Sequence, residues 1–200
     1  MRNDDEIQAI QRCQRGEMAA MSSLIAQYQV PALRLAYLLT GDHALADDIV
    51  QESFLAAYSH IQQFDATRPF APWFFRIVTN VTRMRQRSQR RHGEVSLEIA
   101  LADEQERPSL QAASDPEAVA ELRETREALH AALASLTHLQ REAVILRYYY
   151  GYADQEIAAI TGCRVGTARE RLYSGLQALE RRIRQEYPWL LGAGQIRSTL

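Results

Sequence analysis

The sequence predicts an all-α protein, with two small helical domains joined by an acidic linker and a helix-turn-helix in the second domain. Glycine and proline are sparse, at 9 and 6 of 200 residues, and strand-type alternation of apolar and polar residues is almost absent. Ala, Leu, Glu, Gln and Arg dominate, and these residues favour helix. Hydrophobic residues make up 46 % of the chain, which is enough to bury a core.

The first predicted domain spans residues 1–92 and begins with helical patterns. Residues 5–30 have a helical pattern that is interrupted near Gly16. Pro31 is expected to start or kink the next helix, because its ring removes a backbone donor and clashes with the preceding turn. Residues 40–42, Thr-Gly-Asp, combine a helix stop with a new helix start.

Two further helices are predicted in this domain, over residues 45–64 and 70–91, with a proline-containing loop between them. The second of these is aromatic in its first half and rich in arginine in its second half. The first has apolar residues at i, i+4, i+7 and i+11, which predicts one buried stripe. The members of that stripe are Val50, Phe54, Ala57 and Ile61.

Residues 93–116 are predicted to be a flexible linker, because low apolar density accompanies six acidic residues and one arginine. The second domain is predicted over residues 117–187, and residues 188–200 form a tail. Gly151 and the turn at residues 161–163 divide this domain into helices. Those helices are predicted over residues 117–134, 137–150, 154–160 and 164–186.

Charge is segregated along the chain, although the net charge is only −2. All 23 basic residues are arginine. Residues 83–91 hold five arginines and no acid, and residues 164–184 hold six arginines against two glutamates. Residues 94–127 carry ten acids against three arginines. Two basic segments around an acidic middle indicate two contacts with a polyanion.

A short helix, a three-residue turn with glycine and a longer helix form a helix-turn-helix pattern in the second domain. The long helix has an apolar stripe on one side, which leaves its polar side free to enter a DNA major groove. Arginine pairs bidentately with guanine there, worth about 1–3 kcal/mol of discrimination. A generic amphipathic surface helix is the alternative. The polar side holds Thr167, Glu170, Arg171 and Ser174, flanked by Arg169 and Tyr173.

The sequence does not indicate an enzyme, a cofactor or a small-molecule substrate. No glycine-rich phosphate loop, pair of catalytic carboxylates or nucleophile–base arrangement stands out. Cys13 and Cys163 lack metal-ligand spacing, so no metal site is expected and both are interpreted as reduced thiols. No apolar run is long enough for a membrane span, and the acidic N-terminus lacks a signal peptide. A cytoplasmic protein without direct membrane insertion is therefore expected.

Four stretches resemble segments of one family, the sigma-70 factors of bacterial RNA polymerase, in particular their extracytoplasmic-function (ECF) group. Residues 154–173 (DQEIAAITGCRVGTARERLY) resemble the promoter-reading helix-turn-helix, and residues 136–147 (LTHLQREAVILR) the helix before it. Residues 46–55 (ADDIVQESFL) resemble the polymerase-binding helix. Residues 70–80 (FAPWFFRIVTN) resemble the next segment, which melts and reads the −10 element. The order of these motifs around a linker makes the resemblance specific.

The resemblance implies a sigma factor that binds core RNA polymerase and recognises the −10 and −35 elements of promoter DNA. The implied polymerase-binding residues are Asp47, Asp48, Gln51 and Glu52. The implied −10 residues are Trp73, Arg76, Asn80, Arg83, Arg85 and Arg87. The implied −35 residues are Thr167, Arg169, Glu170, Arg171 and Tyr173. Trp73 has an alternative interpretation as a core residue, whereas the Asn80 amide offers both a donor and an acceptor to a base edge.

The resemblance also implies control by an anti-sigma factor. Two other functions stay open from the residues alone: an autonomous helix-turn-helix repressor and a helical protein-interaction module. The family usually has Ser or Thr where this chain has Ala153, so the cap of the following helix is expected to shift to Asp154.

Overall fold

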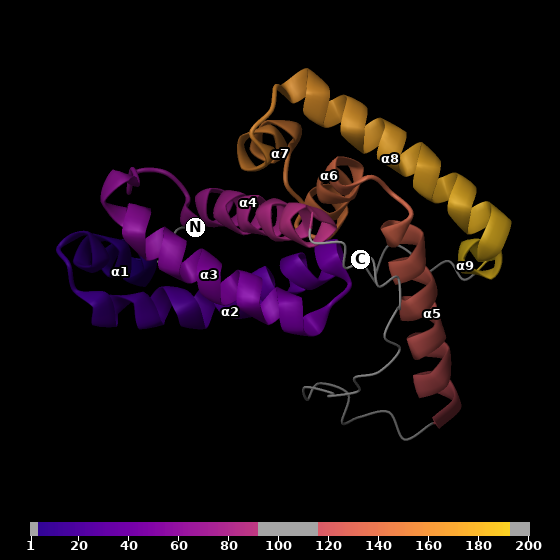
Figure 1. Ribbon diagram of the computed structural model, residues 1–200, viewed down its shortest axis with the longest axis horizontal. Helices are drawn as coiled ribbons and strands as arrows, with labels where there is room; N and C mark the ends of the chain where they lie inside the picture. The colour runs from indigo at the N-terminus through magenta and orange to yellow at the C-terminus, as the bar shows by residue number, and fades with distance from the viewer. Residues whose placement is uncertain (1–3, 92–115, 193–200) are drawn as a thin grey trace.

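The computed structural model describes residues 4–91 and 116–192, and all regular structure in these residues is helical (Figure 1). The all-α prediction is therefore confirmed. Nearly all of the predicted linker and most of the predicted tail lie outside the described residues. The α-helices are α1 (Asp4–Gln14), α2 (Met21–Thr40), α3 (His43–His60), α4 (Phe70–Arg91), α5 (Pro116–Ala134), α6 (His138–Tyr148), α7 (Asp154–Thr161), α8 (Val165–Glu186) and α9 (Trp189–Gly192), with short 3-10 turns at Met18–Ala20 and Ile61–Gln63.

Helices α2, α3 and α4 pack against one another, and α1 lies against α2 (Figure 1). Phe74 of α4 is fully buried at their centre. Its ring stacks on Phe54 with centroids 4.6 Å apart and meets the edge of Tyr28 at 6.0 Å. Such aromatic pairs add to the stabilisation from buried area. The predicted stripe on α3 and the following turn is confirmed as buried.

Helix α2 runs through Pro31, so of the two predicted alternatives the start of a new helix at this position is wrong. Proline in a helix interior costs about 3 kcal/mol, because one backbone hydrogen bond is lost and the ring crowds the preceding turn. Burial on both sides of it offsets this cost: Leu24 and Leu35 have no exposed surface. The Tyr150 hydroxyl also donates to the Pro31 carbonyl at 2.6 Å. Tertiary packing therefore overrides the local signal.

Helices α6, α7 and α8 form the predicted helix-turn-helix with its preceding helix (Figure 1). Thr137 caps α6, and its backbone N–H donates to the Gln140 side chain at 3.1 Å. Gly162 ends α7 in the left-handed conformation, with φ of 68°, which glycine adopts without a side-chain clash. The turn that separates the two helices therefore depends on a glycine at this position.

The expected shift of the α7 cap to Asp154 is wrong, since Ala153 remains the residue before the helix. Alanine has no side-chain acceptor, and Glu156 compensates by accepting the Ala153 backbone N–H at 2.8 Å. The Asp154 carboxylate instead accepts Nε of Arg169 at 2.6 Å and also bonds Arg147. Asp154 therefore joins α7 to both α6 and α8.

Gly175 allows α8 to pass close to α6. A Cβ at this position would lie 3.0 Å from Cγ2 of Val144 and 3.2 Å from Cβ of Gln140. We expect Gly175→Ala to lower the free energy of unfolding by about 1 kcal/mol, because overpacking of about 1–3 kcal/mol outweighs the gain in helix propensity. Urea denaturation followed by circular dichroism measures this difference.

The matched control is Gly166→Ala on the same helix, where a Cβ would have no neighbour within 4 Å. This change should leave stability unchanged or raise it by up to about 1 kcal/mol. Equal stability of the two alanine variants would contradict the close approach of α6 and α8.

The two halves of the chain share one buried core. Helix α7 lies against α4, and helix α6 lies against α2 (Figure 1). Leu146 of α6 and Ile157 and Ile160 of α7 belong to the same apolar cluster as the residues of α1–α4. Helix α7 is therefore packed against both α4 and α8.

None of the helices in residues 4–91 and 116–192 is long and apolar enough to cross a membrane.

Candidate nucleic-acid and polymerase interfaces

Helix α4 presents three sets of side chains in three directions. The first is apolar and buried among α2 and α3. The second is Phe75, Thr79 and Arg83, which follow one another at four-residue intervals and therefore form one stripe, called the covered stripe below. It faces α6, α7 and the turn between them. The third set is exposed or lines a surface hollow that is described below. The buried, apolar set named first comprises Phe70, Phe74, Val78 and Val81.

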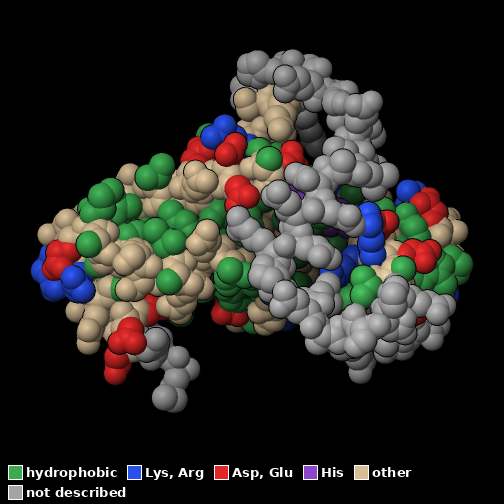
Figure 2. All heavy atoms as spheres, turned by 90° about the horizontal axis from the view of Figure 1, so that it is seen from below, with side chains coloured by type: hydrophobic (Ala, Val, Ile, Leu, Met, Phe, Trp, Pro, Cys, Tyr) green, Lys and Arg blue, Asp and Glu red, His purple; other side chains and the backbone are tan. Residues whose placement is uncertain are grey.

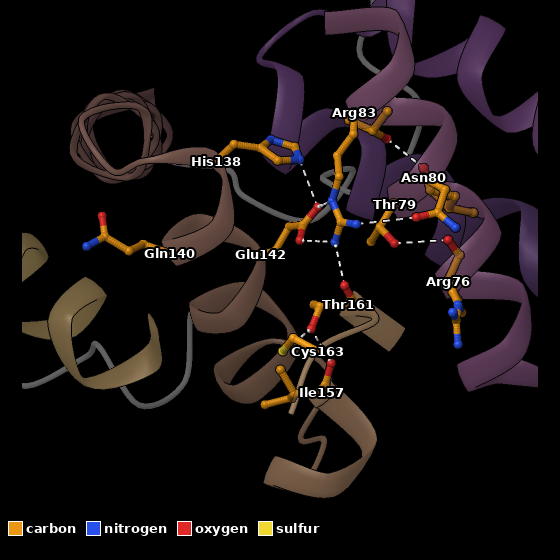
Figure 3. A network of polar contacts seen from close by, with 12 residues as sticks. Arg76, Thr79, Asn80, Arg83, His138, Gln140, Glu142, Ile157, Thr161 and Cys163 are labelled. Atoms are coloured by element: carbon orange, nitrogen blue, oxygen red, sulfur yellow. Dashed lines mark hydrogen bonds and ion pairs between the residues drawn. The ribbon is translucent and has the colours of Figure 1, made fainter. Parts of the chain in front are cut away.

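Arg83 of the covered stripe is paired with Glu142 of α6 (Figure 3). Its Nε donates to Oε1 at 2.8 Å and its Nη2 to Oε2 at 2.6 Å, a bidentate arrangement. Nη2 also donates to the Thr161 carbonyl at 3.2 Å. Glu142 has no exposed surface, and Nε2 of His138 lies 2.8 Å from its Oε1. This implied −10 residue is thus engaged by the other half of the chain.

Arg76 and Asn80 lie beside the covered stripe and are exposed. Arg76 donates to the Ala159 carbonyl at 3.4 Å, so it too reaches α7. The Asn80 Oδ1 accepts Nη1 of Arg83 at 3.3 Å (Figure 3). The structure therefore brings Arg76, Asn80 and Arg83 together on one side of α4.

A surface hollow of about 250 Å³ lies on the exposed side of α4. Asn80, Arg83, Met84 and Arg87 line it. An amide, guanidinium groups and a thioether offer hydrogen bonds, positive charge and an apolar contact, which are the features that an unpaired base and its phosphate require. Met84 was missed by the sequence analysis. Its signal is an apolar residue, 51 % exposed, within an arginine-rich run.

Three implied −10 residues do not line this hollow: Arg76, whose contact with α7 is described above, Trp73 and Arg85. Trp73 is half-buried, with its ring 4.8 Å from Phe64 and 5.4 Å from Phe70, which favours the core interpretation. Arg85 donates Nε to Glu52 of α3 at 2.8 Å. Arg85 therefore joins the implied DNA-binding helix to an implied polymerase-binding residue.

The implied polymerase-binding residues share one face of α3. Asp48 and Gln51 are exposed, whereas Asp47 and Glu52 are half-buried. Leu55, one turn after Gln51, is 66 % exposed. An exposed leucine beside carboxylates is typical of an interface with an apolar centre and a charged rim. Leu55 was missed, although its position off the buried stripe of α3 is visible in the sequence.

The implied −35 residues lie in the first two turns and the middle of α8. Glu170 and Tyr173 are exposed, whereas Thr167 and Arg171 are half-buried. Arg169 is exposed and bonded to Asp154, as described above. This hydrogen bond, together with the charge of Arg147, holds the pKa of Asp154 below its ordinary value. The pairing fixes the start of α8 relative to α7.

Basic side chains are unevenly distributed on the surface. On the face seen in Figure 2, the left-hand part is mostly hydrophobic and neutral polar, with basic and acidic side chains side by side at its far end. The arginines of α4 described above contact α6, α7 and α3 instead.

Both halves of the chain match families of the same kind. Residues 24–92 match the family described as Sigma-70 region 2, and residues 126–179 match Sigma-70, region 4. These segments include α3, α4 and the helix-turn-helix. A repressor or a simple interaction module would leave the match in the first half without a role. The paired matches therefore favour the sigma-factor interpretation.

The ECF RNA polymerase sigma-E factor of Salmonella typhimurium is 32 % identical over 178 residues, covering 87 % of this chain and 92 % of its own. The ECF RNA polymerase sigma factor SigW of Bacillus subtilis is 28 % identical over 177 residues, covering 88 % and 95 %. The fold is similar to that of the sigma factor RpoE of Bartonella quintana, solved in complex with the anti-sigma factor NepR. That match has a TM-score of 0.63 and 22 % identity, covering 82 % of this chain and 97 % of that one. The chain therefore belongs to the ECF group of the sigma-70 family and is an RNA polymerase sigma factor that acts in transcription initiation.

Proposed function

We propose that this sigma factor contacts promoter DNA at two sites, the −10 and −35 elements, while its α3 face is bound to core polymerase. The hollow on α4, lined by Asn80, Arg83, Met84 and Arg87, carries the proposal. It receives unpaired bases of the −10 element, with the amide reading a base edge and the arginines holding phosphates. The protein itself carries out no bond chemistry, and it works in the cytoplasm.

The helix-turn-helix addresses the −35 duplex through the polar side of α8. Glu170 and Tyr173 are exposed there, and Arg171 is accessible in part. Thr167, in the first turn of α8, lies where backbone N–H groups attract a phosphate. An anti-sigma factor controls the protein, a proposal supported by the solved complex of the related Bartonella quintana protein.

Run-off transcription with purified core polymerase tests this function. Templates from the protein's own genome should give discrete transcripts only when the protein is added. Asn80→Ala and Arg171→Ala should each reduce transcript yield about tenfold, since one base contact is worth about 1–3 kcal/mol. Gln29→Ala, an exposed position on α2, is the control and should not change the yield. Full activity of both variants would contradict the assigned DNA contacts.

A further inference from the structure

The hollow on α4 is formed by one face of the helix. Asn80, Arg83, Met84 and Arg87 lie at i, i+3, i+4 and i+7, a spacing that places them on the same side of successive turns. Asn80 and Met84 are both exposed, and Met84 lies one turn after Asn80. A base that enters the hollow therefore meets an amide and a thioether side by side.

Arg83 determines which end of the Asn80 amide is left for a ligand. Nη1 of Arg83 donates to Oδ1 of Asn80 at 3.3 Å (Figure 3). A guanidinium group carries only donors, so it pairs with the oxygen of an amide and not with its nitrogen. Within residues 4–91 and 116–192, no group accepts a hydrogen bond from Nδ2 of Asn80. The amide therefore presents its two N–H donors, while its oxygen is already engaged.

An amide that presents only donors discriminates among the four bases. Thymine and guanine have acceptors at their major-groove edges, whereas cytosine has an amino donor there and adenine has a donor beside an acceptor. A cytosine at this edge would place its amino group against the Asn80 N–H groups, and both sides would lack an acceptor. The orientation of the amide therefore favours thymine or guanine.

Met84 separates thymine from guanine. Its side chain is 51 % exposed at the edge of the hollow. Thymine carries a C5-methyl group next to its O4 acceptor, and apolar side chains contact this methyl group in DNA complexes. Guanine has no methyl group and would leave the thioether without an apolar partner. Together, the amide donors and the thioether match thymine.

We propose that the hollow on α4 selects an unpaired thymine, with Nδ2 of Asn80 donating to O4 and Met84 packed on the C5-methyl group. Arg83 is a positioning residue, because it acts through the Asn80 amide. The inference rests on the proposed function, which places unpaired −10 bases on α4. It adds the identity of one base and the parts that Met84 and Arg83 play in its selection.

Three single strands test the two contacts separately. Holoenzyme assembled from core polymerase and this protein is titrated against fluorescent strands of about twelve thymidines, deoxyuridines or deoxycytidines. Thymidine should bind about fourfold more tightly than deoxyuridine, which lacks only the methyl group. Deoxyuridine should bind about tenfold more tightly than deoxycytidine, in which an amino donor replaces the O4 acceptor. Equal dissociation constants for the three strands would overturn the selection of thymine.

Met84→Ala removes the contact with the methyl group. The dissociation constants for thymidine and deoxyuridine should then agree within about twofold. Met18→Ala is the matched control, because Met18 is also an exposed methionine and lies in the turn after α1. The control should keep the fourfold preference for thymidine, as in the parent. A Met84→Ala holoenzyme that kept this preference would show that Met84 does not contact the methyl group.

Asn80→Asp keeps the shape of the side chain and replaces its two donors with an acceptor. A carboxylate accepts from the cytosine amino group, so this variant should prefer deoxycytidine to deoxyuridine, the reverse of the parent. The added negative charge repels all three strands alike, so the ratio of dissociation constants reports the base contact. An unreversed preference would contradict the role of the amide donors.

Arg83→Met tests the positioning role. Without the guanidinium, the Asn80 amide is free to turn over and offer its oxygen, so the preference for deoxyuridine over deoxycytidine should fall from about tenfold to about twofold. The preference for thymidine over deoxyuridine should stay, because Met84 is unchanged. Arg184→Met, at an exposed position of α8, is the control and should keep both preferences. Unchanged preferences in Arg83→Met would exclude the positioning role.

Asn80→Ala separates this proposal from the proposed function. It should weaken the binding of thymidine and deoxyuridine strands about tenfold and that of deoxycytidine strands by less than about twofold. Equal weakening for all three strands would support DNA binding by α4 and overturn the selection of thymine. If all three dissociation constants stayed at their parent values, both proposals would fail.

Discussion

Phe74→Ala is expected to lower the free energy of unfolding by about 4 kcal/mol. Phe74 is fully buried, and its ring contacts Phe54, Phe70 and Tyr28. Truncation of a buried phenylalanine to alanine typically costs about 3–5 kcal/mol, because the apolar transfer energy is lost and a cavity remains. The loss also disconnects the aromatic contacts that hold α4 against α2 and α3. Urea denaturation followed by circular dichroism measures the difference.

Phe74→Leu is the matched control for this core position. Leucine refills most of the cavity, so we expect a loss of about 1–1.5 kcal/mol. Leu55→Ala, at an exposed position on the adjacent helix α3, should change stability by less than about 0.5 kcal/mol. A loss below about 1 kcal/mol for Phe74→Ala would show that Phe74 is not central to the core.

Asp48→Arg is expected to weaken binding to core polymerase about 100-fold. Asp48 is exposed on the proposed polymerase face of α3. Reversing its charge replaces an attraction with like-charge repulsion, which costs several kcal/mol across a complementary interface. Because the residue is exposed, the folded state should keep its stability. Titration of fluorescently labelled core polymerase with each variant measures the affinity.

Leu55→Ala examines the apolar centre of the same face and should weaken binding about tenfold, as expected for a truncated interface anchor. Asp5→Arg is the control for charge reversal, since Asp5 is exposed on α1, away from the proposed face. If Asp48→Arg and Asp5→Arg reduced affinity equally, α3 would not be the polymerase contact.

Local patterns in the sequence predicted most of the fold. The stripe from Val50 to Ile61 and the turn at Gly162 follow from helical spacing and from the φ angle that glycine tolerates. At Pro31 the predicted start of a new helix is wrong. Its neighbours bury enough surface to keep α2 continuous, and this depends on α1, α3 and α4 rather than on the residues next to it.

The candidate site was predictable only as a set of residues. Asn80 and Arg83 are adjacent on the helix surface because they are three residues apart, so their proximity follows from the sequence. The pairing of Arg83 with Glu142 does not follow from the sequence, because 59 positions separate the two residues and many other carboxylates could pair with Arg83. Likewise, the exposure of Leu55 and Met84 depends on which neighbouring helices leave those faces open.

The two hydrogen bonds of Asp154 restrict how α6, α7 and α8 can move relative to one another. Its bonds to Arg147 and Arg169 brace α6, α7 and α8 against one another, and Gly175 keeps α8 in close contact with α6. These helices would consequently travel as one rigid body. Helix α8 would already be folded when it reaches the major groove, so promoter binding would not have to supply the free energy of folding it.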